Sequence, residues 1–138
     1  MPVDVVLSQR EELLGPGPEE VFSVCALHGS DVVGVCTGVR MTWAESRHRI
    51  EMVQVVVREG SRRRGVAREM MQLVSEHFST RGVEIVQVSA EHTDKEAIAA
   101  YQRLGFHQFG LLREGLKFDS NYSDEVMLAA PIRKMLGK

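Results

Sequence analysis

The region that most constrains the fold of this chain runs from residue 50 to residue 78. Its first part, residues 50–58, is nearly continuously apolar and rich in valine, which predicts a central strand covered on both faces. Its last part carries apolar residues at helical spacing, which predicts an amphipathic helix that ends near Gly82 as its C′ residue. The residues of the helical stripe are Val66, Met70, Leu73, Val74, His77 and Phe78.

Between this strand and this helix lies a loop, residues 59–67, that reads EGSRRRGVA. The N-terminus of a helix exposes unpaired backbone N–H groups and the positive end of the helix dipole, and glycine lets an anion approach the backbone. Three arginines in the same loop favour a polyanion such as a pyrophosphate. The alternative, a solvated arginine cluster at the start of a helix, places like charges where the dipole opposes them.

Two common phosphate-binding motifs do not fit this loop. Gly60 and Gly65 have the spacing of GxxxxGK[ST], but Val66 and Ala67 stand where Lys and Ser or Thr must contact phosphate and Mg²⁺. The GxGxxG fingerprint is absent, and the chain is short for a doubly wound dinucleotide-binding sheet. The loop therefore argues against both an NTPase and a dinucleotide-binding enzyme.

The rest of the chain alternates short β-rich segments with one more helix. We expect strands at residues 3–7, 21–27, 32–41, 83–90, 108–113 and 125–130. Ser8 and Glu11 match a capping box for a turn of helix. A second long helix begins near Asp94 and ends at Gly105. The order β, β, β, β, α, β, α, β, β predicts an α/β domain on a mixed sheet.

Composition limits the classes of protein to which the chain can belong. With 138 residues, 43% of them hydrophobic, residues 1–138 are expected to form one domain. The net charge of −2 argues against long nucleic-acid tracks, although 13 of the 17 basic residues are arginine. No apolar run is long enough for a membrane helix and no signal peptide is evident, so we expect a cytoplasmic protein without membrane association. Two cysteines, Cys25 and Cys36, give neither a disulfide framework nor a zinc motif.

Two short motifs carry a resemblance to a known family. Arg62-x-x-Gly65-x-Ala67 follows the valine-rich segment, and Tyr101-Gln-Arg-Leu-Gly105-Phe106 lies downstream. In this context the sequence resembles the GCN5-related N-acetyltransferase (GNAT) family over residues 21–131. The resemblance implies a mixed, mostly antiparallel sheet of about six or seven strands flanked by helices. The N-terminal region is shorter than is usual in the family, so the acceptor site is either open or completed by another subunit or by the loop around Trp43.

The resemblance also implies acetyl-CoA as the co-substrate. The backbone of the strand before the loop would pair with the pantetheine arm, and loop amides would hold the pyrophosphate. Asp94 stands where many members have Asn, and Arg103 could reach the adenosine 3′-phosphate or simply be exposed. The implied acetyl-CoA-binding residues are Val55, Val56, Val57, Arg62, Arg63, Arg64, Gly65, Val66, Ala67, Arg68, Asp94 and Arg103.

For catalysis the resemblance points to Tyr101 as the group that protonates the departing thiolate, a role that suits a phenol of ordinary pKa about 10. The alternative for Tyr101 is a packed ring with its hydroxyl at the surface. Glu51 is the first choice for the general base that deprotonates the amine. Other candidates for the base are His48, Glu91, His92 and a chain of waters.

The function that follows is transfer of an acetyl group from acetyl-CoA to a primary amine of a small molecule or peptide. No cysteine stands where a covalent nucleophile is expected, so direct attack in a ternary complex is favoured, without a metal. A non-catalytic acyl-CoA-binding module with the same fold is the main alternative, and a nucleic-acid binder is a weaker one. A homodimer is expected only because it is the commonest assembly.

Overall fold

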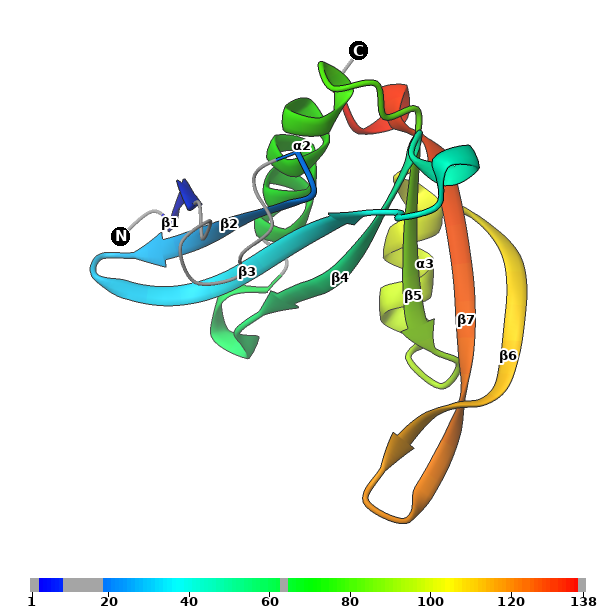
Figure 1. The fold of residues 1–138 in the computed structure, drawn as a ribbon. Helices are drawn as coiled ribbons and strands as arrows, with labels where there is room; N and C mark the ends of the chain where they lie inside the picture. The colour runs from blue at the N-terminus through cyan, green and yellow to red at the C-terminus, as the bar shows by residue number, and fades with distance from the viewer. Residues whose placement is uncertain (1–2, 9–18, 63–64, 137–138) are drawn as a thin grey trace.

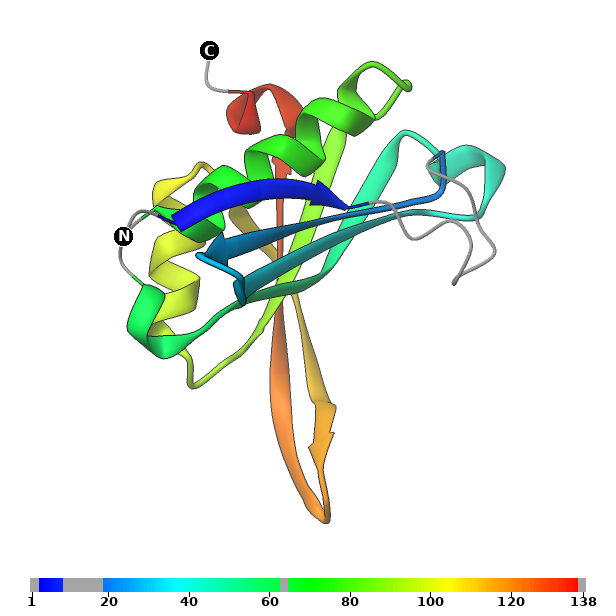
Figure 2. The ribbon, with the colours of Figure 1, turned by 90° about the vertical axis from the view of Figure 1, so that its left-hand side faces the viewer.

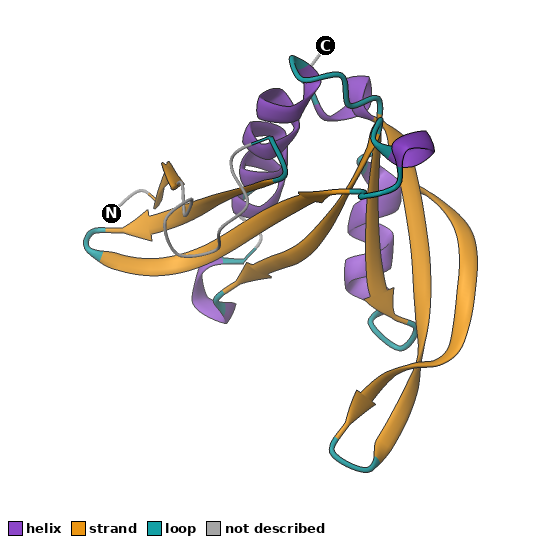
Figure 3. Ribbon diagram, in the orientation of Figure 1, coloured by secondary structure: helices purple, strands orange, loops and turns teal. Residues whose placement is uncertain are grey.

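The computed structural model describes residues 3–8, 19–62 and 65–136. Seven strands form one sheet in the order β1-β2-β3-β4-β5-β7-β6 (Figures 1 and 3). All neighbouring strands are antiparallel except β4 and β5, which are parallel. The strands are β1 (Val3–Ser8), β2 (Val21–His28), β3 (Asp31–Arg40), β4 (Arg49–Val57), β5 (Ile85–Glu91), β6 (His107–Phe118) and β7 (Asn121–Pro131), and the α-helices are α2 (Val66–Ser79) and α3 (Lys95–Arg103).

The predicted order of strands and long helices is confirmed, as is the mixed, mostly antiparallel sheet. Short 3₁₀ turns lie at Ala44–Ser46, Glu59–Ser61 and Ile132–Met135. The helical turn expected from Ser8 and Glu11 falls largely on residues outside the described part of the chain. Among the residues that the structure describes, no helix is long and apolar enough to cross a membrane.

Helix α2 supplies much of the core, as its apolar stripe predicts. Met70, Val74 and Phe78 are fully buried against the sheet, and Met71 and Ser75 are buried beside them. The helix stops at Ser79 with Thr80 as its C-cap, so Arg81 is the C′ residue and the predicted C′ residue, Gly82, lies one position farther along. Gly82 adopts a φ of +83° farther along, in the turn that leads into β5.

Strand β4 differs from its prediction. It is not covered on both faces, because Val53 and Val56 are 53% and 59% exposed. At Val53 there is a bulge: Gln54 pairs with Thr37 and Met52 with Gly38, which leaves Val53 without a partner. Val56 is regularly paired and points to the face of the sheet opposite Val55 and Val57. A strand covered on both faces requires the valines at 53, 55 and 57 to pack in the core; this expectation is wrong for Val53, while Val55 and Val57 do pack against the core.

The last two strands are longer than their apolar segments predicted. Beyond the sheet, β6 and β7 continue as a hairpin that projects from the body of the molecule (Figure 2). Residues 114–124 are mostly polar or glycine, which made them look like a loop. Their strand structure comes from pairing across the hairpin, where Leu116 pairs with Ser123 and Phe118 with Asn121.

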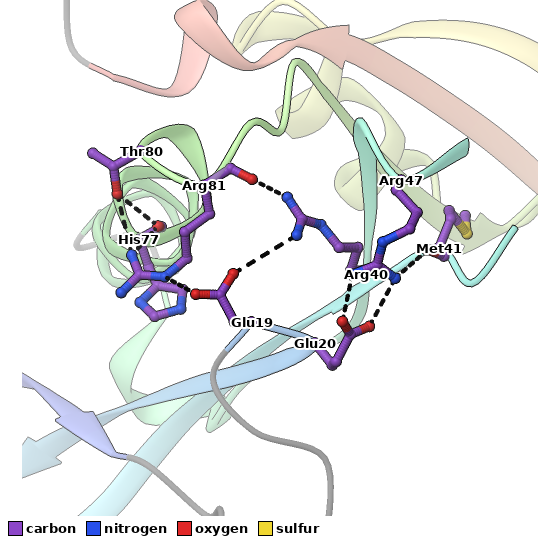
Figure 4. A network of polar contacts seen from close by, with 8 residues as sticks. All are labelled: Glu19, Glu20, Arg40, Met41, Arg47, His77, Thr80 and Arg81. Carbon is purple, nitrogen blue, oxygen red and sulfur yellow. Dashed lines mark hydrogen bonds and ion pairs between the residues drawn. The ribbon is translucent and has the colours of Figure 1, made fainter. Parts of the chain in front are cut away.

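An ion-pair network ties the C-terminal end of α2 to the sheet (Figure 4). The buried Arg40 donates to the carbonyl of Arg81 and lies 3.9 Å from the Glu19 carboxylate, which also faces Arg81 at 3.6 Å. Both terminal nitrogens of Arg47 donate hydrogen bonds to the Glu20 carboxylate, and the bond from Nη1 to Oε2 measures 3.0 Å. The network therefore anchors both ends of the segment between β3 and β4.

Candidate functional site

The sheet opens in the middle, between its two parallel strands. β4 and β5 pair only at Arg49 with Ile85, Ile50 with Val86, and Glu51 with Gln87. Beyond Glu51 each strand stays paired with its other neighbour, β3 or β7, and the two diverge (Figure 1). Backbone pairing between β4 and β5 therefore stops directly after Glu51, and a gap in the hydrogen-bonded sheet begins there.

The backbone of β4 presents its free edge to this gap. The amide of Arg58 donates to the Val33 carbonyl at 2.7 Å, so it points toward β3. Because backbone polar groups alternate in direction along a strand, those of Val56 also point toward β3, whereas those of Val55 and Val57 point into the gap. The carbonyl of Val57 accepts a hydrogen bond from Arg62 Nε at 3.0 Å, which agrees with this direction. Of the three valines, two therefore offer backbone groups for pairing.

The N-terminus of α2 lies past the end of β4. Gly65 is the N-cap residue, with φ +73° and ψ 13°, and no side chain caps the helix there. A Cβ at this position would meet nothing within 4 Å, so the space beside it is open. The first intrahelical bond runs from the Glu69 amide to the Gly65 carbonyl at 3.0 Å. The amides of Val66, Ala67 and Arg68 precede it and have no partner within the helix.

The charged residues expected around this terminus are only partly described. Arg62 and Arg68 are exposed beside it, whereas Arg63 and Arg64 lie outside the described residues. Arg103, in the last turn of α3, is also exposed. Asp94 is the N-cap of α3, where its carboxylate accepts a hydrogen bond from the Ala97 amide at 3.1 Å. Asp94 therefore has a structural role that does not require a ligand.

Tyr101 lies on the core side of α3. Its ring is half-buried and packs edge-on against Phe106, with the centroids 5.8 Å apart. Burial raises the pKa of the Tyr101 hydroxyl to about 12, with smaller contributions from Cys36 and Asp94. The ordinary phenol pKa assumed from the sequence is therefore wrong, and the cause is desolvation of the phenolate form.

Glu51 lies on the opposite face of the sheet from Tyr101. Its neighbours Ile50 and Met52 are buried in the core, so alternation along β4 directs the half-buried Glu51 away from the helices. A ligand that meets both side chains must therefore reach both faces of the sheet, and β4 and β5 cease to pair beside Glu51.

The other candidate bases lie at the ends of strands: His48 directly before β4, and Glu91 and His92 at the end of β5. The His48 carbonyl, at the start of β4, accepts the amides of Glu84 and Ile85. Glu91, at the end of β5, accepts hydrogen bonds from Thr93 Oγ1 at 2.9 Å and Ser123 Oγ at 3.1 Å. His92 is exposed next to it. Glu91 is thus partly engaged in local structure, whereas no hydrogen bond to the Glu51 side chain is found among the described residues.

Two sets of polar side chains on the face of Glu51 were not predicted from the sequence: Gln87, and a chain of three residues on β2, β3 and β4. Gln87 is directly opposite Glu51 in β5, is only 8% exposed and accepts a hydrogen bond from Arg49 at 2.7 Å. Ser23, Thr37 and Gln54 form a second chain across three strands, with oxygen–oxygen distances of 2.8 and 3.0 Å. Strand alternation could have placed Gln87 beside Glu51, but only the register shows that they are direct neighbours.

The family is decided by a comparison with protein-family models. The model of the acetyltransferase (GNAT) family matches residues 4–106 of the 138. The chain belongs to the GNAT family. Among curated proteins, no sequence matches it.

Solved GNAT structures share the fold at low sequence identity. The ribosomal-protein-S18-alanine N-acetyltransferase from Escherichia coli is 18% identical, with a TM-score of 0.69 over 83% of this chain and 70% of its own. A protein from Salmonella typhimurium solved with its cofactor acetyl-CoA is 15% identical, with a TM-score of 0.71 over 88% and 68%. A Bacillus subtilis acetyltransferase in complex with CoA is 14% identical, with a TM-score of 0.70 over 94% and 99%.

Proposed function

We propose that this GNAT-family chain acts as a single N-acyltransferase domain that moves an acetyl group from acetyl-CoA to a primary amine of a small molecule or peptide. The observation that carries the proposal is the loss of pairing between β4 and β5, which starts after Glu51, together with a helix N-terminus whose first amides have no partner within the helix. Family membership and relatives solved with acetyl-CoA or CoA support the choice of co-substrate.

The residues present fit acetyl-CoA. Its pyrophosphate would be held by the amides of residues 66–68, because Gly65 leaves open space beside them. Arg62, Arg68 and Arg103 would add positive charge. The extended pantetheine arm carries amides that suit the backbone groups of Val55 and Val57. When bound, acetyl-CoA supplies an activated acyl group as a thioester.

Tyr101 would act as a hydrogen-bond donor to the leaving sulfur. Because its pKa is about 12, the hydroxyl keeps its proton at neutral pH. A thiol has an ordinary pKa of about 8.5, so complete proton transfer from Tyr101 to the thiolate is uphill, and stabilisation through a hydrogen bond is the larger effect. This role needs the hydroxyl and not the ring alone.

Glu51 would accept the proton of the attacking amine from the opposite face. An alkylammonium ion cannot attack a thioester until it loses a proton, and a carboxylate at the mouth of the gap both attracts the cation and takes that proton, directly or through water. Gln87 and Arg49 lie beside Glu51 on the same face. They would orient the acceptor without taking part in proton transfer.

Direct transfer is favoured over an acyl-enzyme by the state of Cys36, which belongs to the core cluster against which Tyr101 packs. Cys36 is fully buried, and its Sγ lies 3.8 Å from Met52 Sδ. Burial raises the pKa of the Cys36 thiol to about 12, so it does not form the thiolate that nucleophilic catalysis requires.

The test is the release of CoA thiol from acetyl-CoA in the presence of a panel of primary amines and peptide N-termini. We expect release with at least one amine, a loss of kcat of about 10²-fold or more in Glu51→Gln, and a smaller loss in Tyr101→Phe. Glu76→Gln, which alters an exposed carboxylate in the C-terminal half of α2, is the matched control and should keep full activity. Binding of acetyl-CoA without release by any amine would overturn the proposal and favour a non-catalytic binding module.

A further inference from the structure

Two opposite charges lie next to each other on the face of the sheet that carries Glu51. Arg49 and Glu51 are two residues apart in β4, so both side chains point to this face, about 6.6 Å apart along the strand. Both α-helices lie on the other face (Figure 2). In residues 19–62 and 65–136, no ion pair joins Arg49 to Glu51 or to any other carboxylate. Both charges are therefore available to a ligand.

An uncharged partner holds Arg49 in place. Arg49 Nη1 donates a hydrogen bond to Gln87 Oε1 at 2.7 Å, and Gln87 is only 8% exposed. Because a guanidinium can only donate, this bond directs the amide oxygen of Gln87 toward Arg49 and leaves the Gln87 NH₂ group as a further donor. Gln87 is also the direct partner of Glu51 across the sheet. The three side chains thus place two groups of donors beside one carboxylate.

The surroundings of Arg49 favour an anionic ligand. Its direct partner in β5 is Ile85, and on the β3 side the Met41 amide donates to the Arg49 carbonyl at 3.0 Å. Arg49 is half-buried between these apolar residues. A positive charge that is partly removed from water attracts an anion more strongly than a fully solvated one, and the guanidinium fork matches a carboxylate.

The order of the two charges relative to the gap determines how an acceptor would lie. β4 and β5 are still paired at Arg49 and cease to pair after Glu51. An amine at Glu51 therefore faces the gap, while a carboxylate of the same molecule would point back to Arg49. In an α-amino acid a single carbon atom joins the amine to the carboxylate, so both groups can reach side chains that are this close. A peptide N-terminus has an uncharged amide in place of that carboxylate.

We propose that the acceptor is a free α-amino acid, whose carboxylate is bound by Arg49 and Gln87 and whose amine lies at Glu51. This inference rests on the proposed N-acyltransferase function and narrows its acceptor to a zwitterion. The ammonium loses one proton to Glu51, the nitrogen bonds to the acetyl carbon, and the carbon–sulfur bond breaks with its electron pair on sulfur. The second proton lost by the nitrogen converts the CoA thiolate to the thiol. Arg49 takes no part in these steps and only binds the acceptor.

Steady-state acetylation of L-amino acids, each beside its own amide, tests the proposal. The amide keeps the size and the amine of the acid but lacks its negative charge. In Arg49→Gln, the ratio of kcat/KM for the acid to kcat/KM for the amide should fall at least about tenfold relative to the wild type. The loss should lie in KM for the acid, with kcat and the activity on the amide unchanged. The two substrates differ in amine pKa, but this difference is the same for both enzymes and cancels in the comparison.

Two further variants serve as controls. Arg49→Lys keeps the positive charge and loses the planar fork, so it should retain part of the preference for the acid. Arg133→Gln alters an exposed arginine in the turn Ile132–Met135, which packs beside α2. It should retain the full preference.

Binding measured without turnover separates this inference from the proposed function. Isothermal titration of the same amino acids into the chain in the presence of CoA requires no acetyl transfer. Binding that is at least about tenfold weaker in Arg49→Gln, without acetylation of any amine, would support the amino-acid site and overturn the proposed function. An acid-to-amide ratio that is unchanged in Arg49→Gln would overturn the amino-acid site and leave the proposed function standing. A wild type that neither binds nor acetylates any amino acid would also overturn the amino-acid site.

Discussion

An isosteric pair of substitutions at Gly65 measures the charge of the ligand held at the start of α2. Gly65 has a φ of +73°, and a side chain there would enter open space. Asn and Asp tolerate this backbone conformation better than other residues and have nearly the same size. Gly65→Asn and Gly65→Asp therefore differ in one negative charge placed beside the amides of residues 66–68.

The expected magnitude follows from Coulomb's law. A carboxylate about 5 Å from a single negative charge costs about 3 kcal/mol at an effective dielectric of about 20. Because Gly65 is exposed, solvent screening reduces this cost, and about half of it corresponds to a tenfold change in affinity. The Asp variant should therefore bind CoA at least about tenfold more weakly than the Asn variant.

Isothermal titration of acetyl-CoA into the wild type and both variants is the assay, and thermal unfolding checks that both variants fold equally well. We expect the Asn variant to bind within about threefold of the wild type. The reasoning is refuted if Asp and Asn bind equally well. Equal loss in both would show that space, and not charge, controls the site.

Three further predictions concern packing, pH and the state of Tyr101. Gly38→Ala should lower the free energy of unfolding by about 1–3 kcal/mol, because its Cβ would lie 2.7 Å from Val74 Cγ1. Urea titration checks this, with Gly60→Ala as the control because its Cβ meets nothing within 4 Å. An equal loss of stability in the two variants would contradict the prediction. The hydrogen bond from Arg47 holds the pKa of Glu20 below its ordinary value of 4.5. The pair therefore stabilises the fold above pH 4.5, and this stabilisation is lost as the pH falls through the lowered pKa of the folded state. The difference in unfolding free energy between the wild type and Glu20→Gln should therefore shrink in acid, and a constant difference down to pH about 3 would disprove the link. In Tyr122→Phe, Tyr101 is the one remaining tyrosine of the two in the chain, and its phenolate absorbance should rise with a midpoint near its pKa of about 12; a midpoint near 10 would contradict its burial.

Local patterns predicted the parts of the fold that local forces determine. The stripe from Val66 to Phe78 predicted α2 because one helical face must be apolar to pack on the sheet. Asp94 predicted the start of α3 because its carboxylate caps a free amide. The bulge at Val53 was not predictable, because it depends on the register between β3 and β4. The projecting hairpin at the end of β6 and β7 was also missed, since pairing with β7 and not local propensity makes residues 114–118 a strand.

The candidate site likewise has parts that local sequence predicted and parts that depend on contacts between distant residues. The glycine in the loop after β4 predicted an anion-binding helix terminus, and Gly65 adopts the left-handed conformation that suits it. That β4 and β5 separate was expected only from the family resemblance, and the residue after which they separate, Glu51, depends on which strands pair. The sequence could not give the pKa of Tyr101, which depends on burial by residues distant in the chain.

The most direct test of the central claim is to follow the acetyl group itself. Incubation with acetyl-CoA carrying a ¹³C-labelled acetyl group and a panel of primary amines, followed by mass spectrometry, identifies any acetylated product. The account predicts a labelled N-acetyl amine formed in equal amount to the CoA released, with strongly reduced product in Glu51→Gln. Label that remains on CoA with every amine, although acetyl-CoA binds, would contradict it.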